Sequence, residues 1–85
     1  MASYKVLVKR SAAKELEGLP PKARRLVAAN VSGLVVTPRP QGVEKLSGQE
    51  KYRIRQGDYR VLYSIDDTAE TVTVVKIGHR RDEYR

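Results

Sequence analysis

The sequence predicts an α+β fold, in which an N-terminal strand and a helical hairpin pack on one face of a single antiparallel β-sheet. A chain of 85 residues can bury one modest core, so residues 1–85 are expected to form one domain. Helical periodicity is confined to residues 12–35, and alternating β-like runs fill residues 51–77. The expected order is therefore β-α-α-β-β-β, followed by a short C-terminal tail or helix.

A strand and then two helices are expected in the N-terminal half. The stretch "YKVLVKR" carries apolar side chains at alternate positions, which predicts the strand. Ser11 is the expected N-cap of a first helix over Ala12–Leu19. Pro21 suits the first turn of a second helix, which runs to about Val35 because its apolar residues recur at three- and four-residue steps.

Three further strands are expected in the C-terminal half, as an antiparallel meander. The loop "TPRPQG" ends the helical hairpin, since proline and glycine favour extended and turn conformations. The runs 51–56, 59–65 and 71–77 follow, separated by Gly57-Asp58 and by "DDTAE" as turns. If the helices cover one face of this sheet, the other face is partly open, and functional residues are expected there.

Composition and charge limit the kinds of partner and site. The chain has 17 Lys and Arg against 10 Asp and Glu, a net charge of +7, which favours a polyanionic ligand or an acidic protein partner. With no cysteine and a single histidine, no disulfide framework, metal site or cofactor is expected. No apolar run reaches the roughly 18 residues of a membrane span, and no signal peptide is recognisable, so a soluble, cytoplasmic protein is expected.

The stretch "YRIRQGDYRVLY" raises a question of charge, because it brings arginines together in a predicted hairpin. A two-residue Gly57-Asp58 turn puts Arg55 directly opposite Arg60, and Arg53 points to the same face. Like charges placed in this way destabilise a sheet by up to about 1 kcal/mol. Two interpretations are evenly matched: a solvated sheet face, or a phosphate-binding surface made of planar, permanently charged guanidinium groups.

The tail "GHRRDEYR" adds candidates at the end of the last strand. His79 and Arg80 are expected to emerge near the arginine cluster, since this strand lies beside the strand of residues 59–65. A lone histidine is more often structural than catalytic, but its ordinary pKa of about 6.5 suits proton transfer near neutral pH. Tyr84 is expected either to stack on a base or to pack against the sheet.

Taken together, "KLSG", "YRIRQGDYRVLY" and the ending "VVKIGHRRDEYR" resemble the RelE family of bacterial toxins in the RelE/ParE superfamily, over essentially the whole chain. The resemblance implies the α+β fold above and a single RelE-like toxin domain. It also implies a ribosome-dependent mRNA interferase, which cleaves mRNA in the ribosomal A site. The implied chemistry is metal-independent attack of a ribose 2′-OH on the adjacent phosphate, giving a 2′,3′-cyclic phosphate and a 5′-OH.

The resemblance also assigns active-site positions, which are Arg53, Arg55, Arg60, Arg80 and Tyr84. Arg60 and Arg80 match the family pattern and are assigned to stabilising the charge of the phosphorane. The best-known member has lysines where Arg53 and Arg55 stand, and an arginine, with its pKa above about 12, is a poor general base. The hypothesis is that His79 or Tyr84 transfers the proton, while Arg55 helps electrostatically.

Partners follow from the resemblance and from the charge. Basic residues outside the cluster are candidate contacts to mRNA or ribosomal RNA, although an ordinary solvated face explains those of the helices slightly better: Lys14, Lys22, Arg24, Arg25, Lys51 and Arg81. A cognate antitoxin is expected to lay an acidic, partly disordered segment over the arginines or to displace the C-terminal tail. Two alternatives remain, a ParE-like toxin acting on DNA gyrase and a non-catalytic RNA- or protein-binding module of the same fold.

Overall fold

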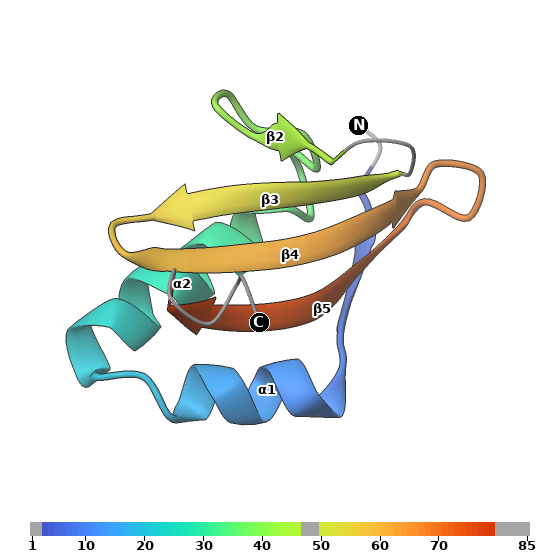
Figure 1. The fold of residues 1–85 in the computed structure, drawn as a ribbon. Helices are drawn as coiled ribbons and strands as arrows, with labels where there is room; N and C mark the ends of the chain where they lie inside the picture. The colour runs from blue at the N-terminus through green and yellow to red at the C-terminus, as the bar shows by residue number, and fades with distance from the viewer. Residues whose placement is uncertain (1–2, 47–49, 80–85) are drawn as a thin grey trace.

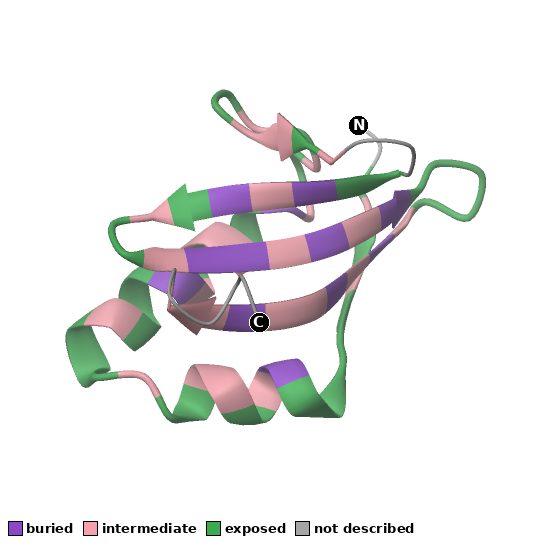
Figure 2. Cartoon of the chain, viewed as in Figure 1, coloured by how far each residue is buried: buried purple, intermediate pink, exposed green. Residues whose placement is uncertain are grey.

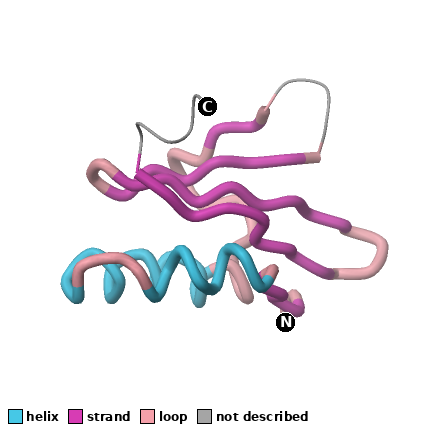
Figure 3. The backbone as a smooth tube through the Cα atoms, turned by 60° about the horizontal axis from the view of Figure 1, so that its bottom comes forward, coloured by secondary structure: helices cyan, strands magenta, loops and turns pink. Residues whose placement is uncertain are grey.

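Within residues 3–46 and 50–79, which this computed structural model describes, two helices pack on one face of a five-stranded sheet (Figure 1). Along the chain the elements are β1 (Lys5–Val8), α1 (Arg10–Glu17), α2 (Pro21–Gly33), β2 (Glu44–Lys45), β3 (Lys51–Gln56), β4 (Tyr59–Asp66) and β5 (Thr71–His79). The turned view in Figure 3 shows both helices on the same side of the sheet. The predicted α+β class is confirmed.

The sheet has the strand order β1-β5-β4-β3-β2, which differs from the expected arrangement at both edges. β1 pairs with β5 in the parallel direction, with Val6 opposite Val72, so the sheet is mixed rather than wholly antiparallel. Alternation within a strand specifies its two faces but neither its partner nor its direction. β2 is a two-residue strand paired with β3 where a linker was expected, because two residues are too few to show alternation.

The helix boundaries lie within two residues of the predicted ones, but the predicted cap at the start of α1 differs. This helix begins at Arg10, and Lys9 holds its N-cap position without a side-chain hydrogen bond, so the prediction that Ser11 caps the helix is wrong. The backbone of Lys9 is hydrogen-bonded both to the sheet and to the helix. Its N–H donates to the carbonyl of Val74 in β5 at 3.0 Å, and its carbonyl accepts from the N–H of Ala13 in α1 at 2.9 Å. The chain therefore passes directly from the edge strand into the helix.

The hydrophobic core lies between the helices and the sheet face that they cover (Figure 2). Side chains from β3, β4 and β5 meet buried residues of the helical layer at this interface. The core consists of Ala12, Val27, Leu34, Tyr52, Ile54, Val61, Tyr63, Ile65, Val72, Val74 and Ile77. Tyr52 and Ile54 of β3 are buried at positions that alternate with Arg53 and Arg55, and Val61, Tyr63 and Ile65 of β4 are buried at alternate positions. The prediction that the helices cover the apolar face of the hairpin is therefore confirmed.

β5 contains an irregularity that α1 stabilises. Its pairing with β4 shifts register between Leu62 and Tyr63, so that Lys76 lies opposite Leu62 while Val74 lies opposite Tyr63. Beside this bulge, the carboxylate of Glu15 accepts a hydrogen bond from the backbone N–H of Ile77 at 2.9 Å. The helix thus satisfies a backbone donor of the strand and fixes the path of its last residues.

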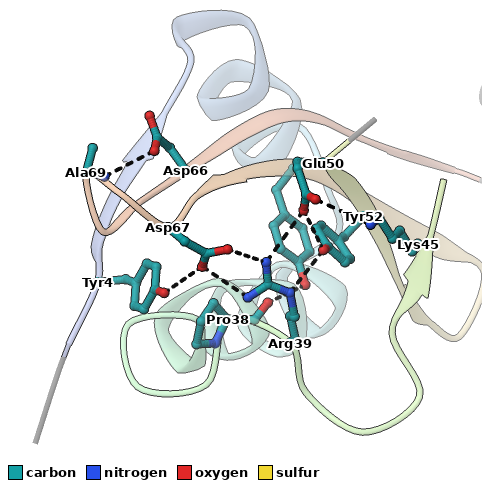
Figure 4. A network of polar contacts seen from close by, with 10 residues as sticks. Tyr4, Pro38, Arg39, Lys45, Glu50, Tyr52, Asp66, Asp67 and Ala69 are labelled. Carbon is teal, nitrogen blue, oxygen red and sulfur yellow. Dashed lines mark hydrogen bonds and ion pairs between the residues drawn. The ribbon is translucent and has the colours of Figure 1, made fainter. Parts of the chain in front are cut away.

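Arg39 fastens the loop between α2 and β2 to the sheet (Figure 4). Its guanidinium donates two hydrogen bonds to Asp67, at 2.8 and 3.2 Å, and its Nε donates to the hydroxyl of Tyr52 at 2.9 Å. The Tyr52 hydroxyl in turn donates to Glu50 at 2.8 Å, and the Tyr4 hydroxyl donates to Asp67 at 2.7 Å. These contacts hold together four segments that are distant in sequence: Tyr4, the loop with Arg39, Glu50–Tyr52, and Asp67.

The carboxylate of Asp67 predicts a loss of stability in acid. Hydrogen bonds from Arg39 and then Tyr4 hold its pKa below the ordinary value. A carboxylate with a depressed folded pKa contributes stability above its unfolded pKa of about 4, and this contribution is lost as the pH falls through the lower folded value. The thermal unfolding midpoint, followed by circular dichroism, is therefore expected to fall as the pH decreases below about 4.

Asp67→Asn tests this link. The variant is expected to unfold at a lower temperature than the wild type at neutral pH and to converge with it in acid, because both then lack the charged acceptor. Asp58→Asn, which removes an exposed carboxylate from the β3–β4 turn, is the matched control and is expected to follow the wild type. A constant gap between Asp67→Asn and the wild type over the whole pH range would contradict the prediction.

Candidate active site

The arginine hairpin has the register that the sequence predicts. Gly57 lies in the turn between β3 and β4 with φ at 60°, a left-handed conformation that glycine adopts without strain. Arg55 lies directly opposite Arg60, and Arg53 lies opposite Leu62. The predicted juxtaposition of like charges across these two strands is confirmed.

Arg53 and Arg55 point to the sheet face that the helices leave uncovered. The residues that alternate with them, Tyr52 and Ile54, are buried on the helical side. Arg55 is exposed and Arg53 is half-buried, while Lys51, on the same side of the strand, is exposed. We call this surface the arginine face, comprising Lys51, Arg53, Arg55 and Arg60.

Glu44 is the member of this site that the sequence reasoning missed. It lies opposite Arg53 in the β2–β3 pair, and its Oε1 accepts hydrogen bonds from Nε of Arg53 at 3.1 Å and from Nε of Arg55 at 2.9 Å. These bonds, the one from Arg53 above all, hold the pKa of Glu44 below its ordinary value. The carboxylate offsets part of the repulsion among the arginines. No local pattern identifies it, because only strand pairing brings it there.

Arg60 is the buried member of the arginine face. Its exposed fraction is 7%, and among the described charged residues it is the one in the buried class. Its Nη1 donates to the backbone carbonyls of Gly57 at 3.3 Å and of Tyr59 at 3.2 Å, which holds the guanidinium against the hairpin turn. These bonds fix the orientation of the guanidinium, so its position is set before any anion binds.

His79 ends β5, but its ring lies on the side of the sheet opposite the arginines. Its strand partner is Tyr59, whose ring it meets edge-on with centroids 5.5 Å apart, and it lines a pocket together with Glu15 and Leu19 of the helical layer. The expectation that His79 neighbours the arginine cluster is wrong at the level of the side chain. The bulge in β5 is the reason, because one extra residue reverses the face of every later side chain.

The basic residues of the helices lie apart from the arginine face. Lys14 is on α1, whereas Lys22, Arg24 and Arg25 are on α2, and all of them are exposed. Both helices cover the opposite side of the sheet (Figure 3), so the structure does not bring these cations to the arginines. If they contact RNA, they do so on a separate surface.

Arg80, Arg81 and Tyr84 lie outside the described residues, so the roles assigned to them remain predictions. Within the described ranges, no three His, Cys, Asp or Glu side chains cluster as metal ligands do. Nor is any helix in these ranges long and apolar enough to cross a membrane.

Residues 6–84 match the sequence model of a family described as the ParE toxin of the type II toxin-antitoxin system parDE. The chain belongs to the RelE/ParE superfamily of toxins. This RelE/ParE toxin is 34% identical over 85 residues to Toxin RelG of Mycobacterium tuberculosis (strain ATCC 25618 / H37Rv), covering 96% of this chain and 97% of that protein. It is also 34% identical over 84 residues to Toxin RelE of the same organism, covering 96% and 87% of the two chains.

The fold comparison agrees with the sequence comparison. A crystal structure of the archaeal RelE-RelB complex from Pyrococcus horikoshii OT3 matches this toxin with a TM-score of 0.83 and 31% sequence identity, covering 92% of this chain and 96% of that chain. The family inferred from the hairpin and tail motifs is therefore confirmed. The protein is a toxin of a type II toxin-antitoxin system.

Proposed function

We propose that this toxin is a ribosome-dependent mRNA interferase, which cleaves mRNA in the ribosomal A site and thereby inhibits translation. The proposed reaction is attack of a ribose 2′-OH on the adjacent phosphate, without a metal, giving a 2′,3′-cyclic phosphate and a 5′-OH. The observation that carries the proposal is the opposed pair of Arg55 and Arg60 on the face that the helices leave uncovered. Two guanidinium groups on directly opposed residues can both donate hydrogen bonds to one phosphate, whose negative charge increases in the transition state.

The arginines have different proposed roles, which follow from their exposure. Arg55 is exposed and can contact RNA directly, whereas Arg60 is held against the turn by backbone carbonyls. We assign Arg60 and, through the family resemblance, Arg80 to the phosphorane oxygens. Arg53 and Arg55 hold the phosphate in register, because a bidentate guanidinium fixes orientation as well as charge.

The sequence-based candidates for proton transfer are His79 and Tyr84. For His79 to act on the arginine face, its ring would have to leave Tyr59 and cross to the other side of the sheet. We therefore propose Tyr84, which the family resemblance places in the active site, as the donor to the leaving 5′ oxygen. Cleavage at the wild-type rate in Tyr84→Phe would rule out this role.

The partners proposed are RNA and an antitoxin. The net charge of +7 favours mRNA and ribosomal RNA. Four exposed cations of the helices are proposed as a second, phosphate-positioning surface: Lys14, Lys22, Arg24 and Arg25. The antitoxin is proposed to cover the arginine face with an acidic, partly disordered segment that folds as it binds. Action on ribosomes places the toxin in the cytoplasm.

Primer extension on a short mRNA in a stalled ribosome with an empty A site tests the proposal. A cut within the A-site codon is expected with toxin and ribosomes together, and no cut is expected with free mRNA. In Arg80→Ala, loss of one donor to the developing charge is expected to slow cleavage by about 10²–10³-fold.

The alternative functions give different results in the same experiment. Growth arrest on expression, without any cut, would overturn the interferase proposal and favour inhibition of DNA gyrase. That activity is the second candidate because the matched family model describes ParE toxins. Binding of RNA without single-turnover cleavage would favour a non-catalytic binding module.

A further inference from the structure

We propose that Glu44 is the general base that accepts the proton of the attacking 2′-OH. The inference rests on the proposed RNA cleavage and names its general base. That role is unassigned because this chain has Arg53 and Arg55 where the best-known member of the family has lysines. An arginine that keeps its proton, with a pKa above about 12, does not act as the base. The structure provides a carboxylate in direct contact with Arg53 and Arg55.

The position of Glu44 suits this role. A 2′-OH lies next to the phosphate that it attacks, so its base must stand within hydrogen-bond reach of the groups that hold that phosphate. Oε1 of Glu44 is 3.1 Å from Nε of Arg53 and 2.9 Å from Nε of Arg55. The side chain of Glu44 is 40% exposed and that of Arg55 is 55% exposed, so both are open to a substrate.

The charge state of Glu44 also suits this role. The charged groups that face it are Arg53 and Arg55 of β3, and Arg60 of β4 lies opposite Arg55. These cations keep the carboxylate ionised at neutral pH, as a base must be before it accepts a proton. The same arginines reduce its basicity, but they also stabilise the negative charge that passes to the phosphate as the proton leaves.

Other described candidates are less well placed. His79 contacts Tyr59 on the helical side of the sheet. Glu50 is engaged by Tyr52 and Lys45 in the network around Arg39, not by the arginine hairpin. Among the residues that the structure describes, Glu44 is the carboxylate bonded to both Arg53 and Arg55.

The proposed step balances in atoms and electrons. The carboxylate of Glu44 takes the proton of the 2′-OH, and the oxygen lone pair forms a bond to phosphorus. The bond from phosphorus to the 5′ oxygen breaks, and the leaving oxygen keeps that electron pair and takes a proton from Tyr84 or water. The products are a 2′,3′-cyclic phosphate and a 5′-OH, and Glu44 later releases its proton to solvent.

Glu44→Gln tests the proposal, because the amide oxygen can still accept hydrogen bonds from both arginines but cannot take the proton. The single-turnover cleavage rate on ribosome-bound mRNA is expected to fall by about 10²–10⁴-fold. The toxin concentration that gives half the maximal rate is expected to stay the same or decrease, since a negative charge is removed from an RNA-binding face. Glu50→Gln removes the same charge outside the site and is expected to cleave as the wild type does.

The pH dependence separates a base from a structural residue. The wild-type rate is expected to be nearly level above about pH 5.5, because a carboxylate base is already ionised there. In Glu44→Gln the rate is expected to rise about tenfold per pH unit, because hydroxide must then remove the proton.

The outcomes distinguish the two proposals. If wild-type toxin cleaves and Glu44→Gln cleaves equally fast with the same pH profile, Glu44 is not the base while the interferase proposal stands. A slow variant with a level pH profile would also overturn the assignment, since it would indicate that Glu44 only positions the arginines. If the wild type does not cleave at all, both proposals fail.

Discussion

The Arg60→Ala variant is expected to lose cleavage by about 10²–10³-fold, with little change in the toxin concentration that gives half the maximal rate. Arg60 is 7% exposed and held by the carbonyls of Gly57 and Tyr59, so it acts as a fixed donor and not as a long-range attractor of RNA. A preorganised donor of this kind stabilises charge that develops in the transition state more than charge already present in the bound substrate. Single-turnover primer extension at saturating toxin measures the effect.

Two further variants make the Arg60 result interpretable. Arg60→Lys keeps the charge but loses the planar fork, and an intermediate rate is expected because a lysine donates as a point charge. Arg10→Ala removes an exposed arginine from α1 and is the matched control, expected to cleave like the wild type. Thermal unfolding of each variant checks that the fold is intact. A folded Arg60→Ala that cleaves at the wild-type rate would remove Arg60 from the proposed mechanism.

The Tyr63→Ala variant is expected to lose about 3–5 kcal/mol of unfolding free energy, a large part of the roughly 5–15 kcal/mol that a domain has. Tyr63 is fully buried, and its ring stacks on that of Tyr52 with centroids 5.7 Å apart. Removal of the ring leaves a cavity between sheet and helices that cannot fully collapse. Urea unfolding followed by circular dichroism is expected to show a large fall in the midpoint.

Tyr63→Phe isolates the hydroxyl from the ring. Burial raises the pKa of this hydroxyl to about 12, so it stays protonated and donates to the carbonyl of Pro38 at 2.7 Å. The variant leaves that carbonyl without this donor, and a loss of about 1–2 kcal/mol is expected. Tyr59→Phe, at a half-buried tyrosine, is the control and is expected to change stability by less than about 0.5 kcal/mol. Equal stability of Tyr63→Phe and wild type would show that the hydroxyl contributes nothing to holding the loop.

The local features of this toxin follow from the sequence by itself. The bounds of β3 and the pairing of Arg55 opposite Arg60 follow from the two-residue turn and from the alternation of apolar and polar side chains along the strands. Both are short-range effects. The helical hairpin follows from apolar spacing and from Pro21 at the start of its second helix. These features need no knowledge of distant residues, so the family motifs and the local physics lead to the same hairpin.

The other groups that reach this hairpin are set by contacts between distant parts of the chain. Glu44 joins the arginines because β2 pairs with β3, and a two-residue strand carries no readable pattern. His79 turns away from them because a bulge in β5, stabilised by Glu15 from α1, reverses the alternation. Both outcomes depend on contacts between segments far apart in the chain, which local propensity does not encode. Local sequence patterns therefore predict the arginine face, whereas strand pairing across the sheet places a carboxylate, rather than the histidine, beside Arg53 and Arg55.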